Sequence, residues 1–326
     1  MMKVVLAGPY PTGAFLRIQK SLAGTNIELI EAATQETFDT ISDVDAVILR
    51  VLQMPKSVIE RFTPRLKLIM RWGAGFDSVD IETAGKKGIA VCNTPGANAY
   101  AVSELAVLLM LAVGRKLICH DRSLHNGVWS KNIFLDQSFT LNNKLVGVIG
   151  GGNIGRQVAQ KVRPFGAKVQ YYDAFRLKSE VEKEHQMEYV DLDQLLRTSD
   201  VVTLHIPLID STKHLLDARR LTIMKDGAIL INTARGGIVD DAALLDAVNS
   251  GKLAGAGLDC LEREPLEKDD PLLANSNIIV TPHVGGGVTD IADAIIPMLI
   301  ENVKLLAAGK PLNYVVNEIF LGMPRT

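Results

Sequence analysis

Short apolar runs alternate with amphipathic segments in the first part of the chain. The runs lie at 4–7, 45–49, 68–70 and 89–92, and each is short enough for a buried strand. Amphipathic segments lie between them, for example at 57–62 and 81–87. Because strands that alternate with helices form parallel sheets, we predict a first α/β domain over residues 1–98.

A long apolar segment follows at 99–117, rich in Ala, Leu and Val. It is apolar nearly all round, so we predict a helix that is buried in the core or against another subunit. Its burial within one subunit looks incomplete, which favours a homodimer. A polar, irregular segment is expected at 125–143.

A second alternation of apolar runs and helical segments then begins. Its six predicted strands lie at 145–149, 169–172, 201–204, 228–231, 254–258 and 278–280. Helical segments separate most of them, for example at 154–162 and 242–250. Six strands in this series match a doubly wound dinucleotide-binding fold. A last helix is predicted from about 289 to 308, where Gly309 and Pro311 end it.

Composition and charge exclude several classes of protein. A chain of 326 residues suits two domains, and a net charge of −2 gives no sign of a nucleic-acid or membrane partner. The longest apolar run, 105–113, is too short to span a bilayer. The three cysteines are far apart and odd in number, so we expect no disulfide framework, no metal site and a reducing, cytoplasmic location.

A glycine-rich turn marks a candidate dinucleotide site between a predicted strand and a predicted helix. Its sequence is Gly150-Gly151-Gly152-Asn153-Ile154-Gly155. Such glycines let backbone N–H groups approach a pyrophosphate at the helix N-terminus. Asp173 ends the next strand, where a carboxylate can accept hydrogen bonds from the ribose hydroxyls and repel a 2′-phosphate. We therefore predict NAD rather than NADP, although Arg176 lies close by. The alternative is a glycine-rich turn of another α/β protein with Asp173 as a surface cap.

Polar residues follow the carboxyl ends of four later strands, the edge at which open α/β sheets bind ligands. Three of them suit hydride transfer to or from an alcohol carbon. His283 has the chemistry of an acid and base, Glu264 could orient it and favour its imidazolium form, and Arg235 could bind a carboxylate through two hydrogen bonds. Each has an alternative: a structural histidine, a solvated loop acid, or an arginine paired with Asp240 or Asp241.

These motifs, taken together and in order, resemble the D-isomer-specific 2-hydroxyacid dehydrogenase family over nearly the whole chain. The matching stretches are 68–77 (Leu-Ile-Met-Arg-Trp-Gly-Ala-Gly-Phe-Asp), Asn93-Thr94-Pro95-Gly96, Ser103-Glu104, the glycine-rich turn, His205-Ile206-Pro207-Leu208, Asn232-Thr233-Ala234-Arg235-Gly236-Gly237, Leu258-Asp259, Glu264-Pro265 and Thr281-Pro282-His283-Val284-Gly285-Gly286.

The resemblance implies a fold of two Rossmann-like domains with parallel sheets. A doubly wound NAD-binding domain would occupy 99–289, and a discontinuous, flavodoxin-like substrate domain would combine 1–98 with 290–326. The family's long helix, here at 99–117, implies a homodimer.

The resemblance also implies the roles of individual residues. Arg235 would bind the substrate carboxylate and keto oxygen, His283 would be the acid and base with Glu264 as its partner, and Asp259 would hold the nicotinamide carboxamide. The substrate-binding residues would be Arg71, Trp72, Gly73, Ala74, Gly75, Arg235 and His283. The cofactor-binding residues would be Thr94, Gly150, Gly152, Asn153, Ile154, Gly155, Asp173, His205, Ile206, Pro207, Thr233, Ala234, Arg235, Asp259, His283 and Gly285.

The predicted activity is hydride transfer between NAD and C2 of a small D-2-hydroxy acid or 2-keto acid. Arg71 before the loop resembles the arrangement in D-3-phosphoglycerate dehydrogenases, but it could equally be a structural ion pair. Glyoxylate and hydroxypyruvate are competing substrates, and phosphite oxidation could use the same residues. Formate is less favoured, because that branch has glutamine where this chain has Glu264. A NAD-sensing corepressor is the non-enzymatic alternative, and we favour an enzyme because little chain follows Asn317.

Overall fold

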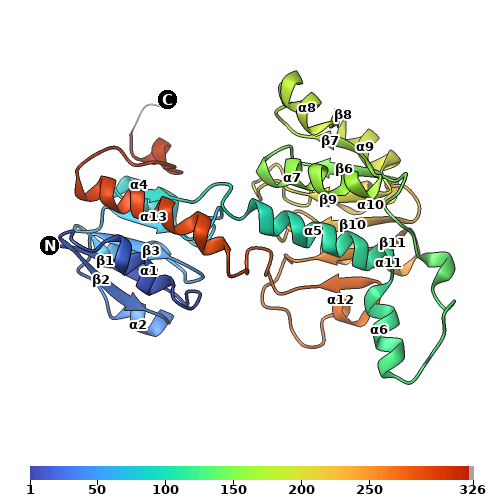
Figure 1. Cartoon of the computed structure of the whole chain (residues 1–326), viewed down its shortest axis with the longest axis horizontal. Coiled ribbons are helices and arrows are strands. Elements are labelled where there is room, and N and C mark those ends of the chain that lie inside the picture. The colour runs from blue at the N-terminus through green and yellow to red at the C-terminus, as the bar shows by residue number, and fades with distance from the viewer. Residues whose placement is uncertain (323–326) are drawn as a thin grey trace. The chain divides into compact units, whose positions relative to one another are not determined.

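The computed structural model describes residues 1–322, which divide into two compact units (Figure 1). The first unit combines 1–98 with the segment that begins at Val288, and the second is Ala99–Gly287. Each unit is built around its own parallel sheet. Among the residues described, no helix is both long and apolar enough to cross a bilayer.

The first unit has a five-stranded parallel sheet in the order β2-β1-β3-β4-β5. This is the strand order of flavodoxin-like folds, which confirms the predicted fold class. The strands are β1 (Met2–Ala7), β2 (Ile27–Ala32), β3 (Ala46–Leu49), β4 (Leu68–Arg71) and β5 (Ala90–Cys92). The pattern misses β2 because it is a half-exposed edge strand in which Glu28 and Glu31 interrupt the apolar residues.

Within the described part of this unit, five α-helices and a short 3₁₀ helix accompany the sheet. They are α1 (Ala14–Ser21), α2 (Gln35–Asp39), α3 (Lys56–Phe62), α4 (Ile81–Lys86), α13 (Ile291–Ala307) and η3 (Glu318–Phe320). Figure 1 shows α13, in red, beside the blue and cyan elements that begin the chain. Its side chains Ile295, Leu299 and Val303 share one face and are fully buried in the core of this unit. The late segment therefore completes the core that the first 98 residues begin.

The second unit has a seven-stranded parallel sheet in the order β12-β11-β10-β9-β6-β7-β8. Its strands are β6 (Leu145–Ile149), β7 (Lys168–Tyr172), β8 (Glu188–Tyr189), β9 (Val201–Leu204), β10 (Ala228–Asn232), β11 (Leu253–Leu258) and β12 (Ile278–Val280). Six of them match predicted strands to within one residue at each end, and β8 was missed because two residues give no periodicity. Strand β6 pairs with β7 on one side and with β9 on the other. Strands after β6 are therefore added first toward one edge of the sheet and then toward the other, and doubly wound folds bind ligands at such a switch point.

Helices cover this second sheet. They are α5 (Ala99–Gly114), α6 (Leu117–His125), η1 (Leu135–Gln137), α7 (Asn153–Val162), η2 (Arg163–Phe165), α8 (Ser179–His185), α9 (Leu192–Thr198), α10 (Ala218–Ile223), α11 (Asp241–Asn249) and α12 (Pro271–Ala274).

The prediction of a single helix at 99–117 is wrong at its C-terminal end, because α5 ends at Gly114 and a second helix, α6, begins at Leu117. Lys116 adopts a left-handed φ of 51° at the break. Its buried ammonium donates to the Ala254 carbonyl at 2.7 Å and to Asn277 Oδ1 at 2.9 Å. Burial lowers the pKa of Lys116, so these two acceptors hold a costly cation in place. The buried lysine thus fixes the direction in which α6 leaves the sheet.

Apolar side chains are exposed on α6 and on the loop that follows it. Leu117, Leu124 and Leu135 are each more than half exposed, and Trp129 is 80% exposed. By contrast, most of α5 is already buried within its own unit. An apolar surface of this kind is typical of a protein interface. The homodimer stays a prediction, and this surface makes α6 and its loop, rather than α5 alone, the expected contact.

We therefore predict that Leu124→Glu weakens dimerisation, because a charge would have to be buried at the interface. Leu16→Glu is the matched control, since both leucines lie on helices and are 52% and 58% exposed. Sedimentation of the parent and of Leu16→Glu should give twice 35.4 kDa, and that of Leu124→Glu should shift toward the monomer. A parent that sediments as a monomer at working concentration would contradict the dimer.

Candidate active site

The glycine-rich turn joins β6 to α7 and has the geometry of a phosphate cradle. Gly150 has a φ of +107°, and an added Cβ there would lie 2.4 Å from the His205 carbonyl oxygen. At Gly155 a Cβ would lie 2.0 Å from the Gly150 carbonyl oxygen, so α7 can pack against the turn only with glycine at this position. A Cβ at Gly152 would meet nothing within 4 Å. Two glycines are therefore required by the fold, while Gly152 opens onto free space at the N-terminus of α7.

This free space fits a dinucleotide pyrophosphate. The first N–H groups of a helix, here those of Asn153 and Ile154, have no partner within the helix and carry partial positive charge. Nearby on the same edge of the sheet, His205 Nδ1 and Thr233 Oγ1 are buried and lack a hydrogen-bond partner within the protein. Unpaired buried polar atoms are costly, so they indicate that a polar ligand completes the site.

Asp173 follows β7 and lies beside the glycine-rich turn. Its Oδ2 accepts from the Gly151 N–H at 2.8 Å, and its Oδ1 accepts from the Phe175 N–H at 2.9 Å. Arg176 is turned to Glu182, with hydrogen bonds of 2.8 and 3.1 Å. The Arg176 guanidinium and the Tyr171 hydroxyl together lower the pKa of Glu182 to about 2, which keeps it ionised as the partner of Arg176. Arg176 is therefore neutralised by Glu182, and the carboxylate of Asp173 is the charged group beside the glycine-rich turn at the end of β7.

His205, which follows β9 together with Ile206 and Pro207, is a neutral histidine. Burial lowers its pKa to about 3, and its Nε2 shares a hydrogen bond of 2.9 Å with Thr203 Oγ1. Its backbone carbonyl packs against Gly150. These contacts suit a residue that shapes the cofactor side of the site and does not exchange protons.

Asn232 shapes the loop after β10 that carries Thr233, Ala234 and Arg235. The Asn232 side chain accepts from the Ala234 N–H at 3.0 Å and donates to the Arg235 carbonyl at 2.9 Å. The Arg235 side chain donates from Nη1 to the Ala234 carbonyl at 2.7 Å. The side chain of Arg235 is thus held at the rim by its own loop.

Asp259, at the end of β11, holds the loop that carries His283. Its buried carboxylate accepts from Thr281 Oγ1 at 2.6 Å, from the Val284 N–H at 2.8 Å and from the Gly285 N–H at 2.8 Å. The Asp259 carbonyl also accepts from the His283 N–H at 3.0 Å. A Cβ at Gly285 would lie 2.9 Å from Asp259 Oδ2, which explains the glycine. These contacts give Asp259 a role that the sequence does not reveal, while its predicted contact with nicotinamide stays a prediction.

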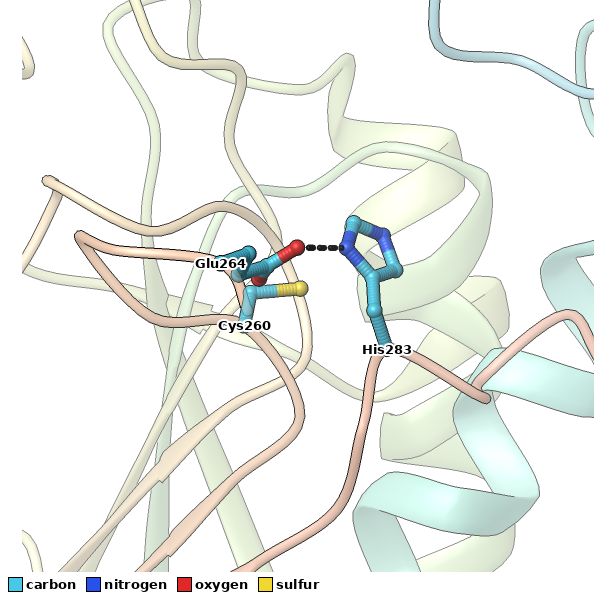
Figure 2. Close-up of side chains that lie close together, drawn as sticks. All are labelled: Cys260, Glu264 and His283. Atoms are coloured by element: carbon cyan, nitrogen blue, oxygen red, sulfur yellow. Dashed lines mark hydrogen bonds and ion pairs between the residues drawn. The ribbon is translucent and has the colours of Figure 1, made fainter. Parts of the chain in front are cut away.

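His283 and Glu264 form a hydrogen-bonded pair at this rim. His283 Nδ1 lies 2.9 Å from Glu264 Oε2, and the two side chains are 48% and 39% exposed (Figure 2). The other oxygen of Glu264 accepts from the Leu261 N–H at 3.0 Å, which fixes the carboxylate. One ring nitrogen of His283 is thus held by a carboxylate, and the other is left to exchange a proton with a ligand.

Cys260 lies beside this pair and was not predicted as a site residue. In Figure 2 its Sγ points into the space between Glu264 and His283. It donates to the Ala234 carbonyl at 3.5 Å, and the residue is 1% exposed. Spacing along the chain gave no signal, because the three residues meet through two separate loops.

The predicted substrate loop, 71–75, lies in the first unit and is held by its own side chains. Arg71 donates to the carbonyls of Gly75 and Leu49, each at 3.0 Å. Thr94 is buried; its Oγ1 accepts from the Gly73 N–H at 3.0 Å and its N–H donates to the Gly73 carbonyl at 3.1 Å. Trp72 is buried and packs edge-on against Tyr10. Arg71, Trp72 and Thr94 therefore shape the loop, and their contacts with substrate or cofactor stay predictions.

Comparison with known proteins places this geometry in a family. The family model for the NAD binding domain of D-isomer specific 2-hydroxyacid dehydrogenases matches residues 107–285. A glyoxylate reductase of Thermococcus litoralis is 37% identical over 88% of this chain and 88% of its own length. A hydroxypyruvate reductase of Thermotoga maritima is 40% identical over 78% of this chain and 82% of its own. A D-3-phosphoglycerate dehydrogenase of Archaeoglobus fulgidus is 35% identical over 97% of this chain and 59% of its own.

The glycine-rich turn generates a prediction with a matched pair of variants. Gly152→Ala should raise the Kd for NADH by about tenfold or more, equivalent to ~1.4 kcal/mol, because its methyl group fills the cradle without a clash in the fold. Gly155→Ala should instead lower the melting temperature, because its methyl group meets a backbone oxygen. Fluorescence titration and thermal melts measure the two effects, and equal effects of both variants on folding would contradict the assignment.

Asp173 generates a prediction about cofactor choice. The parent should use NADH with a higher kcat/KM than NADPH, because the carboxylate repels a 2′-phosphate. Asp173→Asn should lower the ratio of kcat/KM with NADH to kcat/KM with NADPH, since the amide keeps a similar shape without the charge. Glu180→Gln on α8 should leave this ratio unchanged. A parent that uses NADPH equally well would move attention to Arg176.

Proposed function

The chain belongs to the D-isomer specific 2-hydroxyacid dehydrogenase family and is an NAD-dependent oxidoreductase; on this premise we propose that it reduces a small 2-keto acid of the glyoxylate or hydroxypyruvate class. The observation that carries the proposal is the His283–Glu264 pair at the same edge of the sheet as the NAD cradle.

His283 is the proposed proton donor to the keto oxygen. Glu264 holds Nδ1, which orients the ring and stabilises the imidazolium form that must be present before the proton is given. In the oxidative direction the neutral ring takes the hydroxyl proton back. Its exposed position lets the ring reach a ligand at the rim.

Arg235 is the proposed carboxylate ligand. Its hydrogen bond to the Ala234 carbonyl limits the freedom of the side chain, so that less entropy is lost when the guanidinium binds a substrate. A guanidinium can hold the substrate carboxylate and polarise the adjacent ketone at the same time. NADH, when bound at the glycine-rich turn, would supply the hydride to C2.

The contacts of Arg71 favour a small substrate over phosphohydroxypyruvate. Its donors to Gly75 and Leu49 hold the loop together, so the guanidinium already has a structural task. A phosphate site needs a cation that is directed at the ligand. The 35% identity to a D-3-phosphoglycerate dehydrogenase keeps phosphohydroxypyruvate as the second candidate.

A substrate screen tests the proposed function directly. With NADH, kcat/KM should be highest for glyoxylate or hydroxypyruvate and lower for phosphohydroxypyruvate, pyruvate and bulky 2-keto acids. The oxidation of NADH is followed by its absorbance. A preference for phosphohydroxypyruvate would make Arg71 a substrate ligand and overturn the choice of substrate.

Replacement of His283 and of Arg235 separates their roles. His283→Ala should lower kcat by roughly 10²–10⁴, the usual effect of a lost acid and base, with little change in the Kd for NADH. Arg235→Lys should raise KM and also lower kcat, because lysine cannot form two parallel hydrogen bonds. Near-parental kcat in His283→Ala would remove this histidine from the mechanism.

Glu264 should support proton transfer by holding the ring of His283. Glu264→Gln keeps a hydrogen-bonding group but removes the charge that faces Nδ1, so kcat should fall while the Kd for NADH stays close to that of the parent. Steady-state kinetics and titration with NADH measure the two quantities, and a parental kcat in Glu264→Gln would contradict the pairing.

A further inference from the structure

Cys260, Glu264 and His283 form a cluster of potential metal ligands. One ligand atom from each, the thiol sulfur, a carboxylate oxygen and a ring nitrogen, lies within 4.8 Å of the other two (Figure 2). We propose that this cluster is an inhibitory site for Zn²⁺ and similar thiophilic divalent cations, so that the enzyme is reversibly switched off by metal.

The chemistry and spacing of the three ligands suit zinc. Cysteine sulfur, histidine nitrogen and carboxylate oxygen are its preferred donors, at roughly 2.3, 2.0–2.1 and 2.0–2.2 Å, and a tetrahedral ion holds such donors roughly 3.3–3.6 Å apart. The atoms of the cluster reach that spacing by small rotations of Glu264 and His283, whose side chains are at the surface.

Burial gives the site one closed and one open side. Cys260 lies beneath the pair and is 1% exposed, while the other two side chains face solvent. An ion bound here would have three protein ligands and one position open to water. The Cys260 thiol loses its proton on binding and becomes a thiolate ligand.

Binding would block the reaction because it uses the same atoms as the proposed proton transfer. The ion takes the lone pair of one imidazole nitrogen and an oxygen of the carboxylate that orients the ring. A ring with one nitrogen bound to the ion cannot carry a proton on both nitrogens, so the imidazolium form that the proposed mechanism requires is lost. Cys260 itself has no part in that mechanism, so its removal should weaken metal inhibition without removing the acid and base.

The test compares Cys260→Ser with Cys119→Ser. Both cysteines are buried and donate to a backbone carbonyl, but Cys119 lies on α6, away from the cluster. Zn²⁺ should inhibit the parent and Cys119→Ser alike, and a chelator should restore activity. In Cys260→Ser the Zn²⁺ concentration for half-inhibition should rise about tenfold or more, since even outer-shell changes cost ~10–100-fold in metal affinity.

A spectroscopic experiment tests the metal site independently of the proposed activity. Co²⁺ added to the parent without substrate should give the near-ultraviolet absorption of a thiolate–cobalt bond and visible bands of a tetrahedral ion. Cys260→Ser and Cys260→Ala should lose the thiolate band, whereas Cys119→Ser should keep it. Thermal melts establish that each variant is folded before it is titrated.

The inhibition and cobalt experiments together distinguish failure of the proposed function from failure of the metal site. If no keto acid is reduced but the cobalt band is present and depends on Cys260, the proposed function fails and the metal site stands. If Zn²⁺ inhibits Cys260→Ser as strongly as the parent, or if the cobalt band is absent or survives in both Cys260 variants, the metal site is overturned.

Discussion

The buried carboxylate of Asp259 is the constraint on which the rim of the second unit depends. It stands at the end of β11, and the hydroxyl of Thr281 and the N–H groups of Val284 and Gly285 donate to it. A buried carboxylate is costly unless its oxygens are satisfied, so the loop must close on it in one way. That closure leaves His283 with a left-handed φ of 53°, a conformation that costs roughly 1–3 kcal/mol and persists where surrounding contacts determine it.

The parallel sheet brings the other groups to the same edge. Parallel strands end at a common side, so the turn after β6 and the loops after β9, β10, β11 and β12 meet there although they span more than a hundred residues. Each loop is then fixed locally: Asp173 bonds to Gly151, Asn232 to its own loop, and Glu264 to the Leu261 N–H. The site is therefore assembled from short-range contacts on a rigid base.

The sequence predicts what depends on periodicity and motif, and misses what depends on contacts between loops. Two strands are omitted: β2 carries glutamates and β8 has only two residues. Five others (β1, β4, β7, β10 and β11) are predicted too short by one or two terminal residues. The break between α5 and α6 depends on a buried Lys116 whose partners, Ala254 and Asn277, are distant in sequence. The approach of Cys260 to His283 arises from the folding of two loops, so no spacing rule could find it.

Two histidines stand at this rim, and their surroundings explain why one of them is suited to carry a proton. The Nδ1 of His205 is buried and its Nε2 faces a neutral hydroxyl; desolvation lowers its pKa to about 3, so it has no charged form to offer near neutral pH. His283 is half-exposed, and its Nδ1 faces a carboxylate that is itself fixed by a backbone N–H. A proton donor needs both solvent access to be recharged and an anion to stabilise the charged ring. His283 has both, whereas within the part of the chain that the structure describes no anion faces the ring of His205, which favours His283 for the proposed proton transfer and His205 for the proposed cofactor side.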